Sequence, residues 1–90
     1  MYIKKLEWDE RRIHHILRHD VEPDEVWEVC NDTLHLARRQ GHKRYLLYGR
    51  TAAGRYLFVV LEHREGSAYK TITARDMTDG EKRNFRRLKR

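Results

Sequence analysis

Three apolar segments joined by short turns place the strongest constraint on how this chain folds. They cover residues 43–50, residues 55–62 and a stretch that ends with 72–76. The intervening residues 51–54 and 65–67 are small or polar and each set contains a glycine, as hairpin turns do. Strands joined by such short turns pair antiparallel. The sequence therefore predicts an antiparallel sheet that forms the interior of the fold.

Two helices are predicted before this sheet. Asp9 is a good N-cap for a helix that extends to about His19, in which apolar residues recur at helical spacing. Pro23 suits the first turn of a second helix that extends to about Asp32. The following segment, 33–42, is interpreted as a loop that leads into the sheet.

The two ends of the chain complete the predicted fold. Residues 2–6 are expected to form a short edge strand, and residues 78–81 fit a capping box that starts the last helix. The main apolar contacts of that helix are predicted to be Phe85 and Leu88. The resulting order, β-α-α-β-β-β-α, is that of an α+β fold with a small antiparallel sheet and packed helices. A chain of 90 residues is expected to form one domain, 1–90.

Positive charge is concentrated at the C-terminal end of the chain. The net charge is +6, and residues 82–90 carry six basic and no acidic side chains, so the preceding residues are balanced. A basic helix is typical of a contact with nucleic acid or an acidic protein, although a solvated helix end has the same composition. The second helix is acidic, so a nucleic-acid contact is expected elsewhere. The expected contact residues are Lys82, Arg83, Arg86 and Arg87.

Cys30 and the hydropathy pattern indicate the cellular compartment in which the protein is expected. Cys30 is the only cysteine, so no internal disulfide can form, and its place in an amphipathic helix predicts a small core residue. The sequence has no apolar run long enough to span a membrane and no signal-peptide pattern. A cytoplasmic location is therefore expected.

Three arginines stand at the ends of the predicted strands: Arg50, Arg55 and Arg75. A guanidinium group is planar and permanently charged, which suits phosphate. Because the three lie on adjacent strands, they are predicted to converge on one anion. The alternative is that they are solvated or form ion pairs with nearby acids, namely Glu62, Asp76 or Glu81.

Several short motifs, in order, resemble one family of small toxins. The first half contains Trp8-Asp9-Glu10, His15-Ile16, Arg18-His19-Asp20-Val21, Pro23 and Glu25-Val26. The second half contains Gly49-Arg50-Thr51, Gly54-Arg55-Tyr56-Leu57-Phe58-Val59-Val60, Thr73-Ala74-Arg75-Asp76-Met77-Thr78 and Glu81. In this combination the chain resembles the BrnT-like toxins of type II toxin–antitoxin systems.

The resemblance implies a fold akin to the RelE ribonucleases and RNA cleavage that needs neither a metal nor another cofactor. It also implies a DNA-binding antitoxin that blocks the toxin and represses their shared operon, in a toxin–antitoxin hetero-oligomer or with the toxin as a homodimer. Two positions depart from the family pattern. Asp20 stands where a glycine is usual, and Phe85 stands where a tyrosine is usual.

RNA cleavage without a metal requires three tasks. The 2′-hydroxyl must lose a proton, the crowded phosphate must be stabilised, and the leaving oxygen must gain a proton. His15 and His19 lie four residues apart, so they share one helix face, and histidine titrates near neutral pH. The hypothesis is that His15 or His19 is the acid/base, while the three arginines Arg50, Arg55 and Arg75 stabilise the phosphate.

The same residues are also compatible with roles outside catalysis. His15 fits a helix histidine half-buried against the sheet, His19 fits a residue stabilised by the helix dipole, and two histidines are too few for a metal site. Trp8 and Trp27 suit stacking on bases but also suit the core. For the whole chain, the alternatives to an enzyme are a catalytically inactive RNA- or protein-binding module of the same fold and a plain structural domain.

Overall fold

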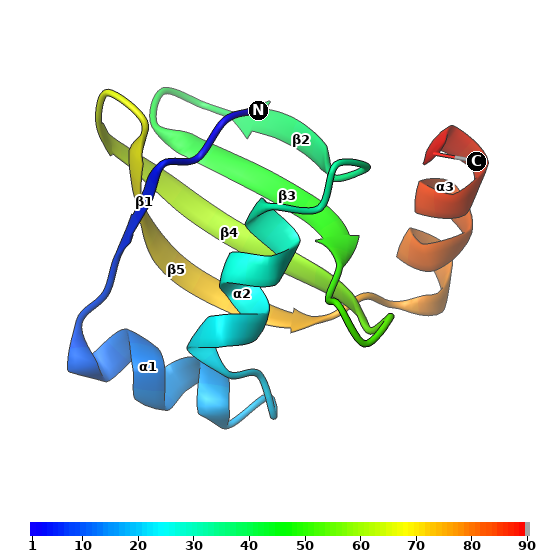
Figure 1. Ribbon diagram of the computed structural model, residues 1–90, viewed down its shortest axis with the longest axis horizontal. Coiled ribbons are helices and arrows are strands. Elements are labelled where there is room, and N and C mark those ends of the chain that lie inside the picture. Colours follow the sequence, from blue (N-terminus) through cyan, green and yellow to red (C-terminus); the bar gives the residue numbers. More distant parts are fainter. Residues whose placement is uncertain (90) are drawn as a thin grey trace.

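A computed structural model describes residues 1–89, which form one mixed sheet and three helices (Figure 1). The elements are β1 (Lys5–Glu7), α1 (Glu10–Leu17), α2 (Pro23–Cys30), β2 (Leu36–Gln40), β3 (Arg44–Arg50), β4 (Tyr56–Glu65), β5 (Ala68–Asp76) and α3 (Asp79–Lys89). The sheet order is β1-β5-β4-β3-β2. The predicted α+β class and the three central strands are confirmed.

The sheet has one strand more than predicted, and the interpretation of residues 33–42 as a loop is wrong. Leu36–Gln40 forms β2, which pairs antiparallel with β3, from Leu36 opposite Tyr48 to Gln40 opposite Arg44. The turn between them contains Gly41 at φ +73°, a left-handed conformation that glycine adopts without strain. Pairing with residues 44–48 of β3 therefore makes a strand of a segment with little strand character.

The edge strand β1 also differs from the expectation of a wholly antiparallel sheet. It covers Lys5–Glu7 and runs parallel to β5, with Leu6 opposite Tyr69. The other three pairings are antiparallel. Because β1 pairs with only the first residues of β5, the second half of β5 has an open edge, and α1 lies beside it (Figure 1).

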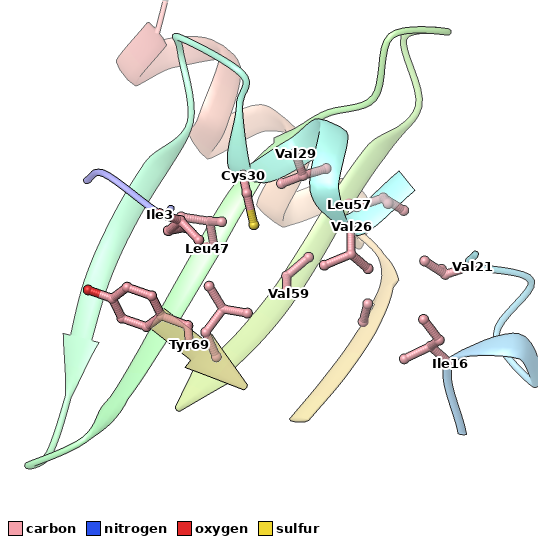
Figure 2. Close-up of a cluster of buried hydrophobic side chains, with 12 residues drawn as sticks. Ile3, Ile16, Val21, Val26, Val29, Cys30, Leu47, Leu57, Val59 and Tyr69 are labelled. Atoms are coloured by element: carbon pink, nitrogen blue, oxygen red, sulfur yellow. The ribbon is translucent and has the colours of Figure 1, made fainter. Parts of the chain in front are cut away.

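One face of the sheet carries the core. Figure 2 shows Val26, Val29 and Cys30 of α2 directed toward Leu47 and Val59 of the sheet, all buried. Burial raises the pKa of the Cys30 thiol to about 12, so this cysteine is an inert core residue, as predicted. Trp8 packs against the same cluster, whereas Trp27 is 41% exposed.

The capping residues of α1 explain how the chain turns toward α2. The side chain of Asp9 accepts a hydrogen bond from the Arg12 N–H at 2.8 Å, which confirms the predicted N-cap. At the other end, the Val21 N–H donates to the Ile16 carbonyl and Asp20 has φ +57°. This is a Schellman motif with its left-handed residue at Asp20. The turn keeps the conformation that a glycine would adopt.

Helix α3 extends from the end of β5 and stands to one side of the body (Figure 1). Thr78 and Glu81 form the predicted capping box, with the Thr78 N–H donating to Glu81 Oε1 at 2.8 Å. Phe85 is 3% exposed, but Leu88 is 48% exposed, so the predicted apolar contact of Leu88 is wrong. Arg90 lies outside the described residues. Within residues 1–89, each helix is too short or too polar to cross a bilayer.

Candidate functional site

The face of the sheet opposite α2 carries the candidate site. Side chains alternate between the two faces along each strand, so the neighbours of the core residues point away from α2. Four aromatic and aliphatic side chains on this outer face are only partly buried: Leu46, Tyr48, Phe58 and Val60. The rings of Tyr48 and Phe58 pack with centroids 5.1 Å apart. Arg50, Arg75, Tyr56 and Thr73 lie on the same face.

The two predicted histidines meet at the open edge of β5. His15 is half-buried, and its Nε2 lies 2.9 Å from the hydroxyl of Thr73. The exposed His19 ring packs edge-on against it, with centroids 5.4 Å apart. Helix α1 is held here because Arg12 Nη1 donates to the Ile72 carbonyl at 3.2 Å. The two rings lie together as predicted, although α1 ends at Leu17 and His19 lies in the turn that follows it. The pair borders the outer face of the sheet.

Arg75 lies two residues beyond Thr73 on the same face of β5. Its guanidinium forms a two-point ion pair with Glu81, at 2.8 and 3.1 Å, and its Cζ lies 4.3 Å from the centre of the Phe58 ring. The guanidinium lowers the pKa of the Glu81 carboxyl. The Nε–H of Arg75 makes no hydrogen bond to residues 1–89, so part of its donor set is open.

Arg55 is fully engaged inside the protein. Its Nε donates to Asp76 at 2.8 Å and its Nη1 to Glu25 at 3.1 Å. The same guanidinium also donates to the backbone carbonyls of His19 and Asp20. Arg55 therefore joins the ends of α1 and β5 to the start of α2, and it presents no free donor edge to a phosphate.

Arg50 has a different environment. Its backbone N–H donates to Asp32 Oδ2 at 2.8 Å, but its guanidinium has no carboxylate partner within the described part of the chain. It lies opposite Tyr56 in the β3–β4 register. The Arg86 guanidinium lies over the Tyr56 ring, 4.9 Å from its centre. The three predicted arginines thus do not converge. Arg55 and Arg75 are paired with acids, while Arg50 lies with Tyr56 and Arg86 in a separate group, the cationic corner.

The basic side chains of α3 and the acidic side chains of α2 lie on separate elements. Of the predicted contact residues on α3, Arg83, Arg86 and Arg87 are exposed and Lys82 is half-buried. The acidic start of α2 lies over the core face (Figure 1). An anionic polymer is therefore attracted to the outer face and to α3 rather than to α2. Among residues 1–89, no group of three or more His, Cys, Asp or Glu side chains is placed to hold a metal ion.

Sequence reasoning missed two contributors to the site. Thr73 orients His15, and the only available signal was its alternation with Arg75 along a predicted strand. Tyr56 lies in a predicted strand, and its hydroxyl accepts a hydrogen bond from Arg86 Nε at 3.4 Å. No sequence signal linked these two residues, which are 30 positions apart.

Comparison with known proteins gives consistent matches. A family model described as "Ribonuclease toxin, BrnT, of type II toxin-antitoxin system" matches residues 8–81. The structure is similar to the crystal structure of the Brucella abortus ribonuclease toxin, BrnT, with a TM-score of 0.69 at 18% identity, over 83% of this chain and 97% of that chain. At this identity the structural match concerns the fold alone. No curated protein matches the sequence.

Proposed function

Because this chain belongs to the BrnT family of ribonuclease toxins of type II toxin–antitoxin systems, we propose that it cleaves RNA by attack of the RNA's own 2′-hydroxyl, without a metal ion. The 2′-oxygen forms a bond to phosphorus as the bond from phosphorus to the 5′-oxygen breaks. A base takes the proton of the 2′-hydroxyl and an acid gives a proton to the leaving 5′-oxygen. The products are a 2′,3′-cyclic phosphate and a 5′-hydroxyl.

His15 and His19 serve as the base and the acid. The observation that carries this assignment is the contact of His15 with Thr73, with the His19 ring packed beside it. Two histidines side by side are suited to taking up one proton and delivering another. Thr73 fixes the ring of His15 through its hydroxyl and so acts as a positioning residue.

Arg75 stabilises the reacting phosphate. It lies about 7 Å along β5 from Thr73, on the same face, from the rise of two residues in a strand. Its open Nε–H is available to a phosphate oxygen, and its charge offsets the negative charge that develops in the transition state. Glu81 competes for the same guanidinium. Arg55 acts as a positioning residue that holds the turn after α1, and Arg50 contributes from the cationic corner.

RNA extends from this edge across the outer face to the basic side chains of α3. The residues proposed for this contact are Lys82, Arg83, Arg86 and Arg87. The antitoxin of the pair is proposed to be a DNA-binding protein that forms a hetero-oligomer with the toxin, and the toxin acts in the cytoplasm.

The test is cleavage of bulk RNA by the purified, antitoxin-free protein in EDTA. His15→Ala, His19→Ala and Arg75→Ala are each expected to lower the rate about 100-fold or more, a typical loss for acid/base and charge-stabilising groups. His14→Ala is the matched control, because His14 is an exposed histidine on the same helix. Unchanged cleavage by all three site variants contradicts the assignment.

A further inference from the structure

A depression opens between α3 and the ends of β3 and β4. It is lined by Leu34, Arg50, Tyr56, Phe85, Arg86 and Lys89. The rings of Tyr56 and Phe85 pack edge-on, with centroids 5.9 Å apart, so that α3 is fixed beside the strand ends. Arg50 and Arg86 therefore lie beside the Tyr56 hydroxyl, and Lys89 lines the same depression.

These cations have no carboxylate partner in the described part of the chain. Within residues 1–89, no carboxylate oxygen lies within 4.0 Å of a side-chain nitrogen of Arg50, Arg86 or Lys89. Among residues 1–89, Arg86 donates only its Nε–H, to the Tyr56 hydroxyl, so its two terminal nitrogens are open to a ligand. Like charges held close together repel one another, and a bound anion relieves that repulsion.

Tyr56 adds a neutral donor to the corner. Its oxygen accepts the hydrogen bond from Arg86, so its own proton is left to donate to a ligand. Arg86 and then Arg50 lower the pKa of the Tyr56 hydroxyl, which records the positive field at this position. A hydroxyl in a positive field is a strong donor to an anionic oxygen.

We propose that Arg50, Tyr56 and Arg86 bind a phosphate group of the RNA strand other than the one that is cleaved. The proposal rests on RNA being the substrate, as proposed above. Arg50 on β3 is two strand spacings across the sheet from Arg75 on β5 and two residues further along, which places the two positions about 12 Å apart. The outer-face rings of Tyr48 and Phe58 lie on the strands that connect the two positions.

The exposed aromatic surface favours RNA over an acidic protein segment as the ligand. A nucleotide offers a base that stacks on an aromatic ring next to a phosphate that needs a guanidinium. The outer face offers both, because the partly exposed Tyr48 ring lies between Arg50 and the Phe58 ring, which the Arg75 guanidinium covers. The corner thereby sets the direction in which the strand crosses the sheet.

The test measures binding of a fluorescent 2′-O-methyl RNA oligonucleotide, which lacks the attacking hydroxyl and so reports binding without cleavage. Arg86→Gln is expected to lower the slope of log affinity against log salt by about 0.7, the value for one phosphate contact on a single strand. Tyr56→Phe is expected to weaken binding roughly two- to tenfold, as the loss of one hydrogen bond does. Arg64→Gln, at the opposite end of β4, is the control and keeps the wild-type affinity.

A second readout separates binding from a structural role of Tyr56. The ionisation of Tyr56 is followed as the absorbance difference between wild type and Tyr56→Phe. A bound phosphate opposes formation of the phenolate, so saturation with the oligonucleotide is expected to raise the pKa of Tyr56. A structural role alone predicts no such shift.

The outcomes distinguish this proposal from the proposed reaction. Normal oligonucleotide binding by Arg86→Gln and Tyr56→Phe, or an unchanged Tyr56 titration, overturns the phosphate site even if RNA cleavage is intact. Binding of polyglutamate is measured for the same variants. If Arg86→Gln and Tyr56→Phe lose polyglutamate binding but retain full RNA binding, the ligand is an acidic protein and the phosphate site is overturned. The expected losses together with an absence of cleavage support the phosphate site and contradict only the reaction.

Discussion

Arg55 and Arg50 flank the same hairpin turn, yet they have opposite environments. Arg50 is the last residue of β3 and Arg55 directly precedes β4. Arg55 binds two carboxylates and two backbone carbonyls, whereas the Arg50 guanidinium has no carboxylate partner among residues 1–89. Arg55 thus holds separate elements of the fold together, an arrangement called the Arg55 clasp, whereas the Arg50 guanidinium, five positions away, is free to bind an anion.

The difference arises from acids that are distant in the sequence. Glu25 is 30 residues from Arg55 and Asp76 is 21 residues from it. The fold brings both acids to one side of the turn and neither to the other. An arginine is available to phosphate where the fold supplies no carboxylate, and this cannot be seen from its position in a strand.

The largest expected effect is the loss of the Arg55 clasp. Arg55→Ala leaves Glu25, Asp76 and the carbonyls at the end of α1 without their donor, and it is expected to destabilise the protein by about 2 kcal/mol. For a domain of this size the melting temperature falls by roughly 8–16 °C. Arg50→Ala is the matched control, with an expected change within about 0.5 kcal/mol. Equal melting temperatures for the two variants contradict the comparison.

A smaller effect, a gain in stability rather than a loss, is expected at the turn that Arg55 holds. Asp20 has φ +57°, a conformation that strains residues with a Cβ. Asp20→Gly removes that strain and keeps the carbonyl that accepts from Arg55, so a gain of up to about 1 kcal/mol is expected. Urea unfolding measures it. A loss of stability would mean that the Asp20 carboxylate, rather than its backbone, supports the turn.

Acid is expected to weaken the ion pairs of Arg55 with Asp76 and of Arg75 with Glu81. Arg55 lowers the pKa of Asp76 from its ordinary value of 3.8, and Arg75 lowers the pKa of Glu81 from its ordinary value of 4.5. Because the folded pKa values are depressed, this stabilisation is complete above about pH 4.5 and is lost as the pH falls through the folded values. Melting temperatures measured from pH 6 to pH 3 follow the loss.

The variant Asp76→Asn is expected to flatten that acid dependence, and a pH profile identical to wild type would show that the ion pair contributes nothing. Arg50→Ala again serves as the control. It should leave the acid slope unchanged, since the Arg50 guanidinium has no carboxylate partner among residues 1–89.

The smallest expected effect concerns Arg75, which is intermediate between the two extremes. Glu81→Gln removes the negative charge that competes for this guanidinium but keeps a capping side chain, because Gln also completes a capping box. Affinity for a 2′-O-methyl RNA oligonucleotide is expected to rise a few-fold, on the scale of one partly exposed ion pair. A decrease in affinity would mean that Glu81 orients Arg75 rather than competing for it.

Much of the fold could be predicted because its determinants are local. The three central strands, the Asp9 cap and the Thr78–Glu81 capping box each depend on residues within one turn or one strand. β2 could not be predicted, since Arg38, Arg39 and Gln40 lack apolar alternation and become a strand only by pairing with β3. The parallel pairing of β1 with β5 joins segments more than 60 residues apart, which no local pattern records.

The candidate site was less predictable for the same reason. The proximity of His15 and His19 could be predicted from their four-residue spacing, although the helix ends before His19. Which arginines form ion pairs could not be predicted. In the sequence, Glu25 is explained as an acidic residue in the first turn of α2, and nothing there indicates that it also binds Arg55. Its second role, as a partner of Arg55, exists only when α2 packs beside the end of β5.

The most direct measurement compares RNA binding by Arg50→Gln and Arg55→Gln across a salt series, below the melting temperature of both proteins. With a 2′-O-methyl oligonucleotide, Arg50→Gln is expected to reduce the salt slope by about 0.7, while Arg55→Gln keeps the wild-type slope. That result would establish that the unpaired arginine binds phosphate and the paired one does not. A reduced slope for Arg55→Gln with an unchanged slope for Arg50→Gln would contradict this division of roles.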